Sequence, residues 1–133
     1  MSQESGRSLA GVRILLVDDH QPSTRLIEAA LAGEGCVIQS AASAEEALRL
    51  LSPDPPHLVL LDLVLPGMGG LDLSKAIKSF PACRDTLLVA VTSKNGNETE
   101  QEVLDAGCIA YLRKPIDPLS LAAYLVRLLT EQA

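Results

Sequence analysis

Short apolar segments alternate along the chain with longer segments whose apolar residues recur at helical spacing. The short segments have the length of strands and are RILLV (13–17), CVIQS (36–40), HLVLLD (57–62), LLVAV (87–91) and CIAYL (108–112). Three of them are almost entirely apolar, as strands covered on both faces of a sheet should be. We therefore predict five strands, three of them covered on both faces.

The segments between and after these strands carry apolar residues three and four positions apart, the spacing of one face of a helix. In the last such segment the expected core stripe consists of Ala122, Leu125, Val126 and Leu129. Ser43 with Glu46 has the pattern of a capping box, and Gly107 lies where a helix should end. The segment 97–106 is acidic and only weakly periodic, so its helix is the least clearly defined.

Alternating strands and helices imply an α/β fold, a doubly wound sheet of five parallel strands with right-handed crossovers and helices on both faces. A chain of 133 residues can bury a full core as one domain without disulfides or a structural metal. We expect this domain to span residues 11–133. Residues 1–10 are rich in Ser, Gln, Glu and Gly and are expected to form a flexible tail.

Composition and charge argue against several classes of protein. The net charge of −6 disfavours direct binding of nucleic acid, which needs clustered Lys and Arg. The N-terminus lacks the apolar region of a signal peptide, and no apolar run reaches about 18 residues, so we expect a cytoplasmic protein without membrane insertion. Cys36, Cys83 and Cys108 are odd in number and match no metal-binding spacing, which suits reduced thiols.

Polar side chains follow four of the predicted strands, at the sheet edge where open parallel sheets bind ligands. They are Asp18 and Asp19 after the first strand, Asp62 at the end of the third, Thr92 and Ser93 after the fourth, and Lys114 with Pro115 after the fifth. Three carboxylates at one edge repel one another unless a cation lies among them. A hard divalent ion with oxygen ligands, Mg²⁺ or Mn²⁺, fits best.

A metal ion, an ammonium and a hydroxyl arranged around a carboxylate can bind a phosphoryl group, whose oxygens carry the charge during transfer. On this interpretation Asp62 is the nucleophile and forms an acyl phosphate. Each feature alone has an ordinary structural explanation, because adjacent aspartates are common in solvated loops. Their coincidence at four strand ends favours the site. His20 and His57 have no Cys or His partner at ligand spacing and are not expected to bind metal.

Four motifs resemble the receiver domain of bacterial response regulators, in spacing as well as identity. These are VDD (17–19), LLDLVLPGMGG (60–70), VTS (91–93) and YLRKP (111–115), and the resemblance covers about residues 11–130. It implies a flavodoxin-like fold with strand order 2-1-3-4-5. It also implies two-component signalling, in which a histidine kinase or a histidine phosphotransfer protein supplies the phosphoryl group. Such a domain is no ordinary enzyme, because it catalyses only its own phosphorylation and dephosphorylation.

The resemblance assigns the metal ligands and the phosphoacceptor. Asp62 becomes the phosphoacceptor and a metal ligand, Asp19 a direct Mg²⁺ ligand, and Asp18 a ligand that acts through water. The backbone carbonyl of Val64 completes the protein ligands. The family often has a polar side chain at this position that can orient an attacking water, and valine cannot, so we expect a relatively long-lived phosphoryl group.

The resemblance also assigns the residues that sense phosphorylation. Thr92 becomes the switch hydroxyl that moves onto the phosphoryl oxygen, and Tyr111 the aromatic residue that changes rotamer with it. Lys114 becomes the cation that contacts the phosphoryl group, and Pro115 follows a cis peptide bond. Lys94, two residues after Thr92, is an alternative contact to the phosphoryl group or its donor, although a solvated side chain is the simpler interpretation.

The last helical segment, LSLAAYLVRLL (119–129), is apolar on almost every side. Besides the expected core stripe it carries a second stripe of Leu121, Tyr124 and Leu128. A helix that is apolar all round is generally covered on all sides. We therefore predict that this second stripe, with Tyr111 beside it, binds a downstream effector or a second copy of the chain in response to phosphorylation.

Three interpretations of the whole protein remain open: a stand-alone receiver, a receiver module cut from a hybrid histidine kinase or a longer regulator, and a metal-dependent phosphatase with a similar sheet. The phosphatase needs a second catalytic Asp two residues after the first, where this chain has Val64. A dinucleotide-binding protein is disfavoured because DDHQPS, and not a glycine-rich loop, follows the first strand.

Overall fold

The computed structural model describes residues 8–93 and 98–132. In this part of the chain the strands are β1 (Arg13–Val17), β2 (Val37–Ala41), β3 (Leu58–Asp62), β4 (Leu87–Thr92) and β5 (Ala110–Arg113). They form a single parallel sheet in the order β2-β1-β3-β4-β5. The predicted strands and the order 2-1-3-4-5 are therefore confirmed.

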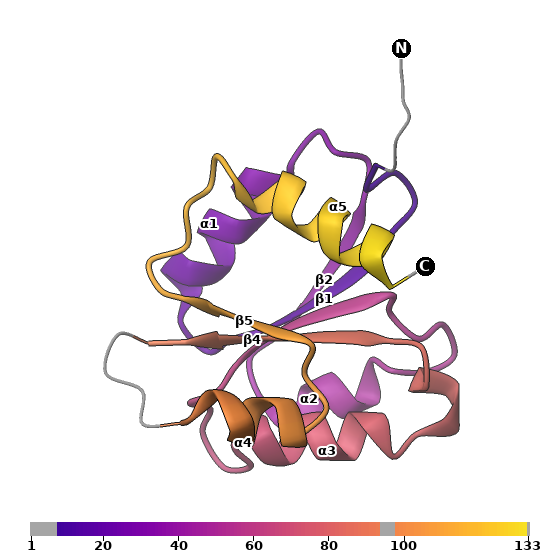
Figure 1. Ribbon diagram of the computed structural model, residues 1–133, viewed down its shortest axis with the longest axis vertical. Helices are drawn as coiled ribbons and strands as arrows, with labels where there is room; N and C mark the ends of the chain where they lie inside the picture. Colours follow the sequence, from indigo (N-terminus) through magenta and orange to yellow (C-terminus); the bar gives the residue numbers. More distant parts are fainter. Residues whose placement is uncertain (1–7, 94–97, 133) are drawn as a thin grey trace.

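Helices cover both faces of the sheet, as predicted (Figure 1). They are α1 (Gln21–Leu31), α2 (Ala44–Arg49), α3 (Gly70–Lys78), α4 (Glu100–Asp105) and α5 (Leu121–Glu131), with a short 3-10 helix at Pro81–Cys83. Figure 1 shows α1 and α5 on one face of the sheet and α2, α3 and α4 on the other. Among the described residues, no helix combines the length and the apolar character that crossing a membrane requires.

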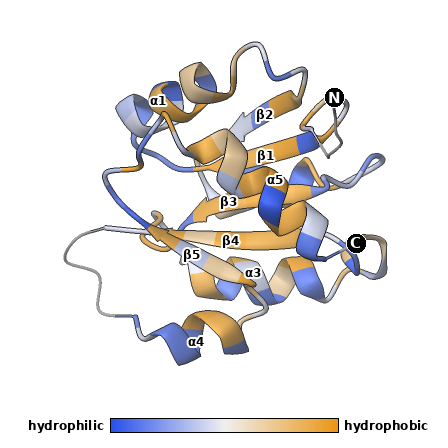
Figure 2. Cartoon of the chain, turned by 45° about the horizontal axis from the view of Figure 1, so that its top comes forward, coloured by the Kyte–Doolittle hydropathy of each residue, from blue (hydrophilic) through white to orange (hydrophobic). Residues whose placement is uncertain are grey.

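Each face of the sheet has its own apolar core. Successive residues of a strand point to opposite faces, so neighbours along β3 belong to different cores. Leu60 packs with the residues of α1 and α5, whereas Leu61 packs with those of α2 and α3. All five residues of β3 are buried, which explains why its sequence is apolar up to the final Asp62. Figure 2 shows the same apolar character along the central strands.

The packed part of the chain begins earlier than the predicted boundary at residue 11. Leu9 is fully buried in the core beneath α1 and α5. Its carbonyl accepts a hydrogen bond from the backbone N–H of Val12 at 3.0 Å, and Gly11 donates to the carbonyl of Gly35 at 3.0 Å. Leu9 therefore belongs to the packed domain and not to a loose tail. One leucine in a polar segment creates no periodicity, so the sequence pattern gave no sign of this contact.

The two apolar stripes of α5 are corrected as well. Leu121 and Leu128, expected on a partner surface, are buried with Leu125 in the core shared with α1. Tyr124 is only partly buried. Spacing identifies two stripes, but it does not determine which of them faces the sheet. Because α5 packs beside α1 as well as on the strands, the helix buries a wider surface than one stripe.

Capping residues fix the starts of α2 and α4, the two shortest α-helices among the described residues. At α2, the Ser43 hydroxyl accepts a hydrogen bond from the N–H of Glu46 at 3.1 Å. The Glu46 carboxylate accepts from the N–H of Ala42 and not from that of Ser43, so only half of the predicted capping box forms. At α4, Thr99 and Glu102 make a complete capping box. Two hydrogen bonds at its first turn support this helix despite its weak apolar periodicity.

Candidate functional site

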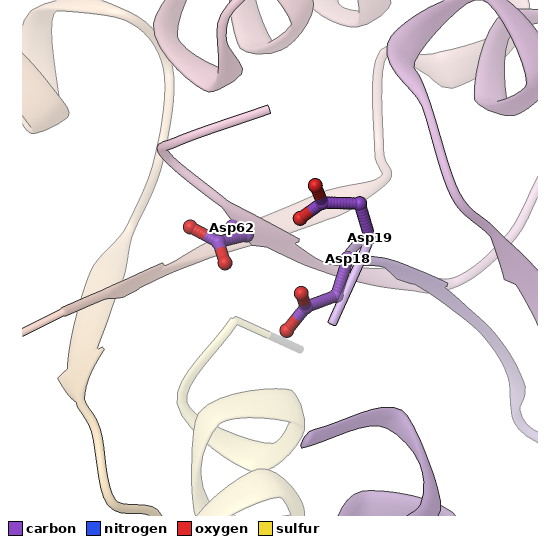
Figure 3. A group of neighbouring side chains, drawn as sticks. All are labelled: Asp18, Asp19 and Asp62. Carbon is purple, nitrogen blue, oxygen red and sulfur yellow. The ribbon is translucent and has the colours of Figure 1, made fainter. Parts of the chain in front are cut away.

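The carboxyl ends of β1 and β3 bring three aspartates together. These strands are neighbours in the sheet, so Asp18 and Asp19, which follow β1, lie beside Asp62 at the end of β3. One carboxylate oxygen from each residue lies within 4.8 Å of the others. Figure 3 shows the Asp18 and Asp19 side chains extending toward Asp62. Asp18 and Asp62 are buried, whereas Asp19 is exposed. The cluster is therefore open to solvent on the side of Asp19.

Lys114 reaches this cluster from the loop after β5. Its Nζ atom lies 2.8 Å from Oδ2 of Asp62 and 3.0 Å from Oδ2 of Asp18. The backbone N–H of Lys114 donates to the carbonyl of Thr92 at 2.8 Å, which extends the pairing of β4 with β5 by one residue. The peptide bond between Lys114 and Pro115 is cis. The ammonium therefore bridges the two buried carboxylates.

The remaining oxygens of the buried carboxylates accept backbone hydrogen bonds from residues two positions further along. Oδ1 of Asp62 accepts from the N–H of Val64 at 2.8 Å, and Oδ1 of Asp18 accepts from the N–H of His20 at 2.8 Å. Each carboxylate oxygen has a second lone pair. Both side chains are thus held in place while keeping lone pairs that can bind a cation.

Burial and charge act in opposite directions on the ionisable groups of this cluster. Burial raises the pKa of Asp18 and outweighs the hydrogen bonds from His20 and Lys114, which lower it. Burial lowers the pKa of Lys114, but the hydrogen bonds and charges of Asp62 and Asp18 outweigh burial, and the net pKa is raised. Lys114 is therefore a permanent cation at neutral pH. One ammonium among three carboxylates leaves the ionised cluster with excess negative charge.

A comparison with known protein families identifies the family of this chain. The sequence model of the response regulator receiver domain matches residues 14–126 of the chain. The chain belongs to this family. It is therefore a receiver domain of two-component signalling, as the motifs at the strand ends implied.

Individual relatives agree with this assignment. The receiver domain is 36% identical over 111 residues to the response regulator PleD of Caulobacter vibrioides, a match that covers 84% of this chain and 24% of PleD. It is 35% identical over 115 residues to an uncharacterized 14.6 kDa protein of Leptolyngbya boryana, covering 86% of this chain and 88% of the relative. The chain thus spans about a quarter of the length of PleD and most of the length of the second relative.

A solved structure supports the fold. The CheY-like response regulator receiver domain protein of Methanospirillum hungatei JF-1 superposes with a TM-score of 0.83 at 30% sequence identity. The match covers 92% of this chain and 97% of the other. The doubly wound, flavodoxin-like sheet predicted from the sequence is therefore confirmed by comparison as well as by topology.

The donor set of the receiver domain fits a divalent metal ion. Mg²⁺ prefers oxygen ligands and keeps several waters, and it commonly binds one or two carboxylates together with phosphate oxygens. The cluster offers carboxylate oxygens only, and the exposed side chain of Asp19 leaves room for water. The predicted ligand set of Asp19, Asp62 and the carbonyl of Val64, with Asp18 acting through water, stays a prediction.

Neither of the two expected switch residues hydrogen-bonds a carboxylate of the Asp18, Asp19 and Asp62 cluster in the described part of the chain. Thr92 ends β4 and is buried, and its hydroxyl donates to the carbonyl of Ser93 at 3.2 Å and not to Asp62. Tyr111 of β5 is partly buried against the core of α2 and α3, and its hydroxyl donates to Glu100 of α4 at 3.4 Å. Tyr111 therefore connects β5 with α4. Lys94, the alternative phosphoryl contact, lies outside the described residues.

Both histidines of the receiver domain hold backbone groups. The His20 side chain caps α1, where Nδ1 accepts a hydrogen bond from the N–H of Ser23 at 3.3 Å. Nδ1 of His57 accepts from the N–H of Arg13 at 2.8 Å. Burial, with the charge of Arg13, lowers the pKa of His57. Since Nδ1 must be unprotonated to accept this bond, the geometry and the pKa direction agree.

The sequence did not show a hollow beside Lys114. The hollow has a volume of about 410 Å³, and its apolar lining comes from α1 and from the loop after β5, at Pro22, Leu26, Pro115 and Ile116. These residues are far apart in the chain, and only the packing of α1 beside this loop brings them together. The hollow adjoins the buried carboxylates through Lys114.

Proposed function

We propose that this receiver domain accepts a phosphoryl group on Asp62 from the phosphohistidine of a histidine kinase or a histidine phosphotransfer protein, with Mg²⁺ or Mn²⁺ bound. The observation that carries the proposal is the pair of contacts on the Asp62 carboxylate. Lys114 contacts one oxygen at 2.8 Å and the N–H of Val64 donates to the other at 2.8 Å. Two further aspartates lie close enough to share a cation with Asp62.

The residues of the site have separate tasks in this transfer. An oxygen of Asp62 attacks phosphorus, the bond between phosphorus and the donor imidazole nitrogen breaks, and the electron pair leaves with the imidazole. The product is an acyl phosphate on Asp62. A bound Mg²⁺ or Mn²⁺ would neutralise negative charge on the carboxylates and on the transferred group. The Lys114 ammonium then contacts a phosphoryl oxygen. The Thr92 hydroxyl exchanges its hydrogen bond to the carbonyl of Ser93 for one to a phosphoryl oxygen.

Phosphorylation by a small donor tests this proposal without the kinase. The receiver domain is incubated with Mg²⁺ and acetyl phosphate, and its intact mass is measured. We expect a gain of one phosphoryl group that is absent in Asp62→Asn. Asp72→Asn is the matched control, because Asp72 is an exposed carboxylate on α3. No gain in the native protein, or an equal gain in Asp62→Asn, would contradict the proposal.

The phosphoryl group is expected to be long-lived because of Val64. This side chain is 60% exposed beside the phosphoacceptor, where water can reach it, but it cannot hydrogen-bond an attacking water. Val64→Asn can orient that water without accepting its proton, so we expect dephosphorylation to accelerate by roughly tenfold, less than a general base contributes. The decay of the phosphorylated mass after removal of acetyl phosphate measures this rate.

Val37→Asn is the control for this change, since Val37 is 55% exposed on β2, away from the carboxylates. It should lose phosphate at the native rate. Decay in the native protein that is as fast as or faster than in Val64→Asn would show that the missing polar side chain at residue 64 does not prolong the lifetime of the phosphoryl group.

We further propose that the phosphorylated domain binds a downstream effector or a second copy of itself at β5 and α5. With Leu121 and Leu128 buried, the accessible part of this face is a hollow of about 600 Å³ whose lining includes Arg113, Tyr124 and Arg127. The Arg127 guanidinium lies 5.9 Å from the centroid of the Tyr124 ring. Arg and Tyr are both enriched where proteins bind one another. Tyr111 on β5 connects this region to α4.

Tyr124→Glu is expected to abolish any increase in mass, or any binding of an effector, that phosphorylation causes. Sedimentation of the phosphorylated and unphosphorylated forms measures self-association. The control is Gln39→Glu, an exposed position on β2 at the opposite edge of the sheet. Association that survives in Tyr124→Glu would place the partner surface elsewhere.

A further inference from the structure

Gly70, the first residue of α3, lies directly against the backbone at the end of β3. Its N–H donates to the carbonyl of Leu63 at 3.1 Å. A Cβ atom at this position would lie 2.6 Å from Cα of Leu63 and closer still to the carbonyl oxygen of Asp62. Both are backbone atoms of a buried segment and cannot rotate away. A side chain at residue 70 would therefore force α3 and the residues around Asp62 apart.

This contact closes the loop that carries the site. Residues 63–69 leave β3 beside Asp62 and return to Gly70, and the hydrogen bond from Gly70 to Leu63 joins the two ends of the loop. The loop contains Val64, whose N–H holds Oδ1 of Asp62 at 2.8 Å. The loop is secured on two sides. Leu63 donates to the carbonyl of Val91 at 3.0 Å, and the buried Ser74 hydroxyl donates to the carbonyl of Gly70 at 3.0 Å.

We propose that Gly70 is a positioning residue for phosphoryl transfer. Because it has no side chain, the first turn of α3 packs directly on the backbone of Asp62 and Leu63. This packing fixes two groups relative to each other: the carboxylate of Asp62 and the main chain of Val64 that holds it. The inference rests on the proposed function of Asp62. Gly70 itself touches neither the metal nor the phosphoryl group, but it determines where Asp62 and the main chain of Val64 lie.

The preceding glycine provides a matched control. A Cβ atom at Gly69 would meet only the carbonyl oxygen of Leu63, at 3.9 Å, an ordinary contact. Gly69 has a φ of −74° and a ψ of 168°, which any residue can adopt. The two adjacent glycines therefore differ in the space around them, so Gly69→Ala adds the same methyl group without displacing Asp62.

A second control separates positioning from general stability. Ile77 is fully buried on α3, in the core shared with α2, about two turns from Gly70. Ile77→Ala leaves a cavity and destabilises the domain without placing an atom near Asp62. The two variants are compared under conditions where circular dichroism shows both to be folded. If Gly70 only stabilised the domain, both variants would lose phosphoryl transfer in proportion to their loss of stability. Loss in Gly70→Ala alone therefore indicates positioning.

The experiment measures the initial rate of phosphorylation by acetyl phosphate over a range of Mg²⁺ concentrations. For Gly70→Ala we expect a rate lowered by roughly tenfold to a hundredfold and a higher Mg²⁺ concentration at half saturation, because misplacing reacting groups by about an ångström costs about a hundredfold. Gly69→Ala and Ile77→Ala should keep the native dependence on Mg²⁺. Their rates should lie within about twofold of the native rate, far less than the loss expected for Gly70→Ala.

Native kinetics in folded Gly70→Ala, or the same loss in Ile77→Ala, would overturn the inference. If Gly70→Ala does not fold, Ser74→Ala takes its place, since it removes the hydroxyl bond to the carbonyl of Gly70 without adding atoms near Asp62. A reduced rate is then expected, and a native rate would overturn the inference. Failure of the proposed function itself is distinguishable, because the native protein would then gain no phosphoryl group.

Discussion

Replacing Lys114 with methionine is expected to lower the free energy of unfolding by about 2–3 kcal/mol when no divalent cation is present. Nζ bridges the buried carboxylates of Asp18 and Asp62 at 3.0 and 2.8 Å. Removing one partner of a buried ion pair typically costs about 3–5 kcal/mol, because the other charge is left uncompensated. The Lys114 side chain is 22% exposed, so solvent screening reduces that figure. Urea denaturation in the presence of EDTA measures the change.

Added Mg²⁺ should recover a large part of this loss, since a divalent ion can replace the ammonium among the carboxylates. Adding Asp18→Asn to Lys114→Met should recover stability as well, because it removes one of the repelling charges. Lys75→Met is the control, since Lys75 is exposed on α3, and it should be close to native. If Lys114→Met unfolds at the native urea concentration in EDTA, the ammonium does not compensate the carboxylates.

The sequence predicted the central strands β1, β3 and β4 because burial on two faces leaves a strong signal. β3 is buried throughout and reads as an unbroken apolar run up to Asp62. The pattern was weaker where one residue, or one of two apolar stripes, decided the packing. Leu9 is a single apolar residue in a polar segment, and the stripes of α5 differ only in how the helix is rotated against α1 and the sheet. Rotation of a helix is set by tertiary contacts that spacing does not contain.

The candidate site could be predicted as a set of residues but not as an arrangement. Parallel strands end at one edge, which sufficed to group Asp18, Asp62 and Lys114. That Lys114 bridges both carboxylates depends on the path of the loop after β5, and the orientation of the Thr92 hydroxyl toward Ser93 depends on local geometry. The difference between adjacent glycines 69 and 70 was invisible in the sequence, because only the approach of α3 to β3 makes one position open and the other closed.

Mg²⁺ is expected to stabilise the native receiver domain, and Asp19→Asn is expected to remove most of that stabilisation. A ligand that binds only the folded state contributes about 1.4 kcal/mol at ten times its dissociation constant and about 2.7 kcal/mol at a hundred times. Lys114 pairs with Asp18 and Asp62, so both ion pairs survive the change at Asp19. The variant should therefore fold normally and lose only the contribution of the ion.

Without metal the sign of the effect should reverse. Asp19 then contributes repulsion to a cluster whose carboxylate oxygens lie within 4.8 Å of one another, so Asp19→Asn should be at least as stable as the native protein in EDTA. Urea denaturation of the native protein and of Asp19→Asn, with and without Mg²⁺, gives the four stabilities, and Asp72→Asn should show the native difference between the two conditions. A full Mg²⁺ effect in Asp19→Asn would mean that the ion binds elsewhere. A variant that is less stable than the native protein in Mg²⁺ but at least as stable in EDTA would show that Asp19 contributes stability through the bound ion and costs stability without it.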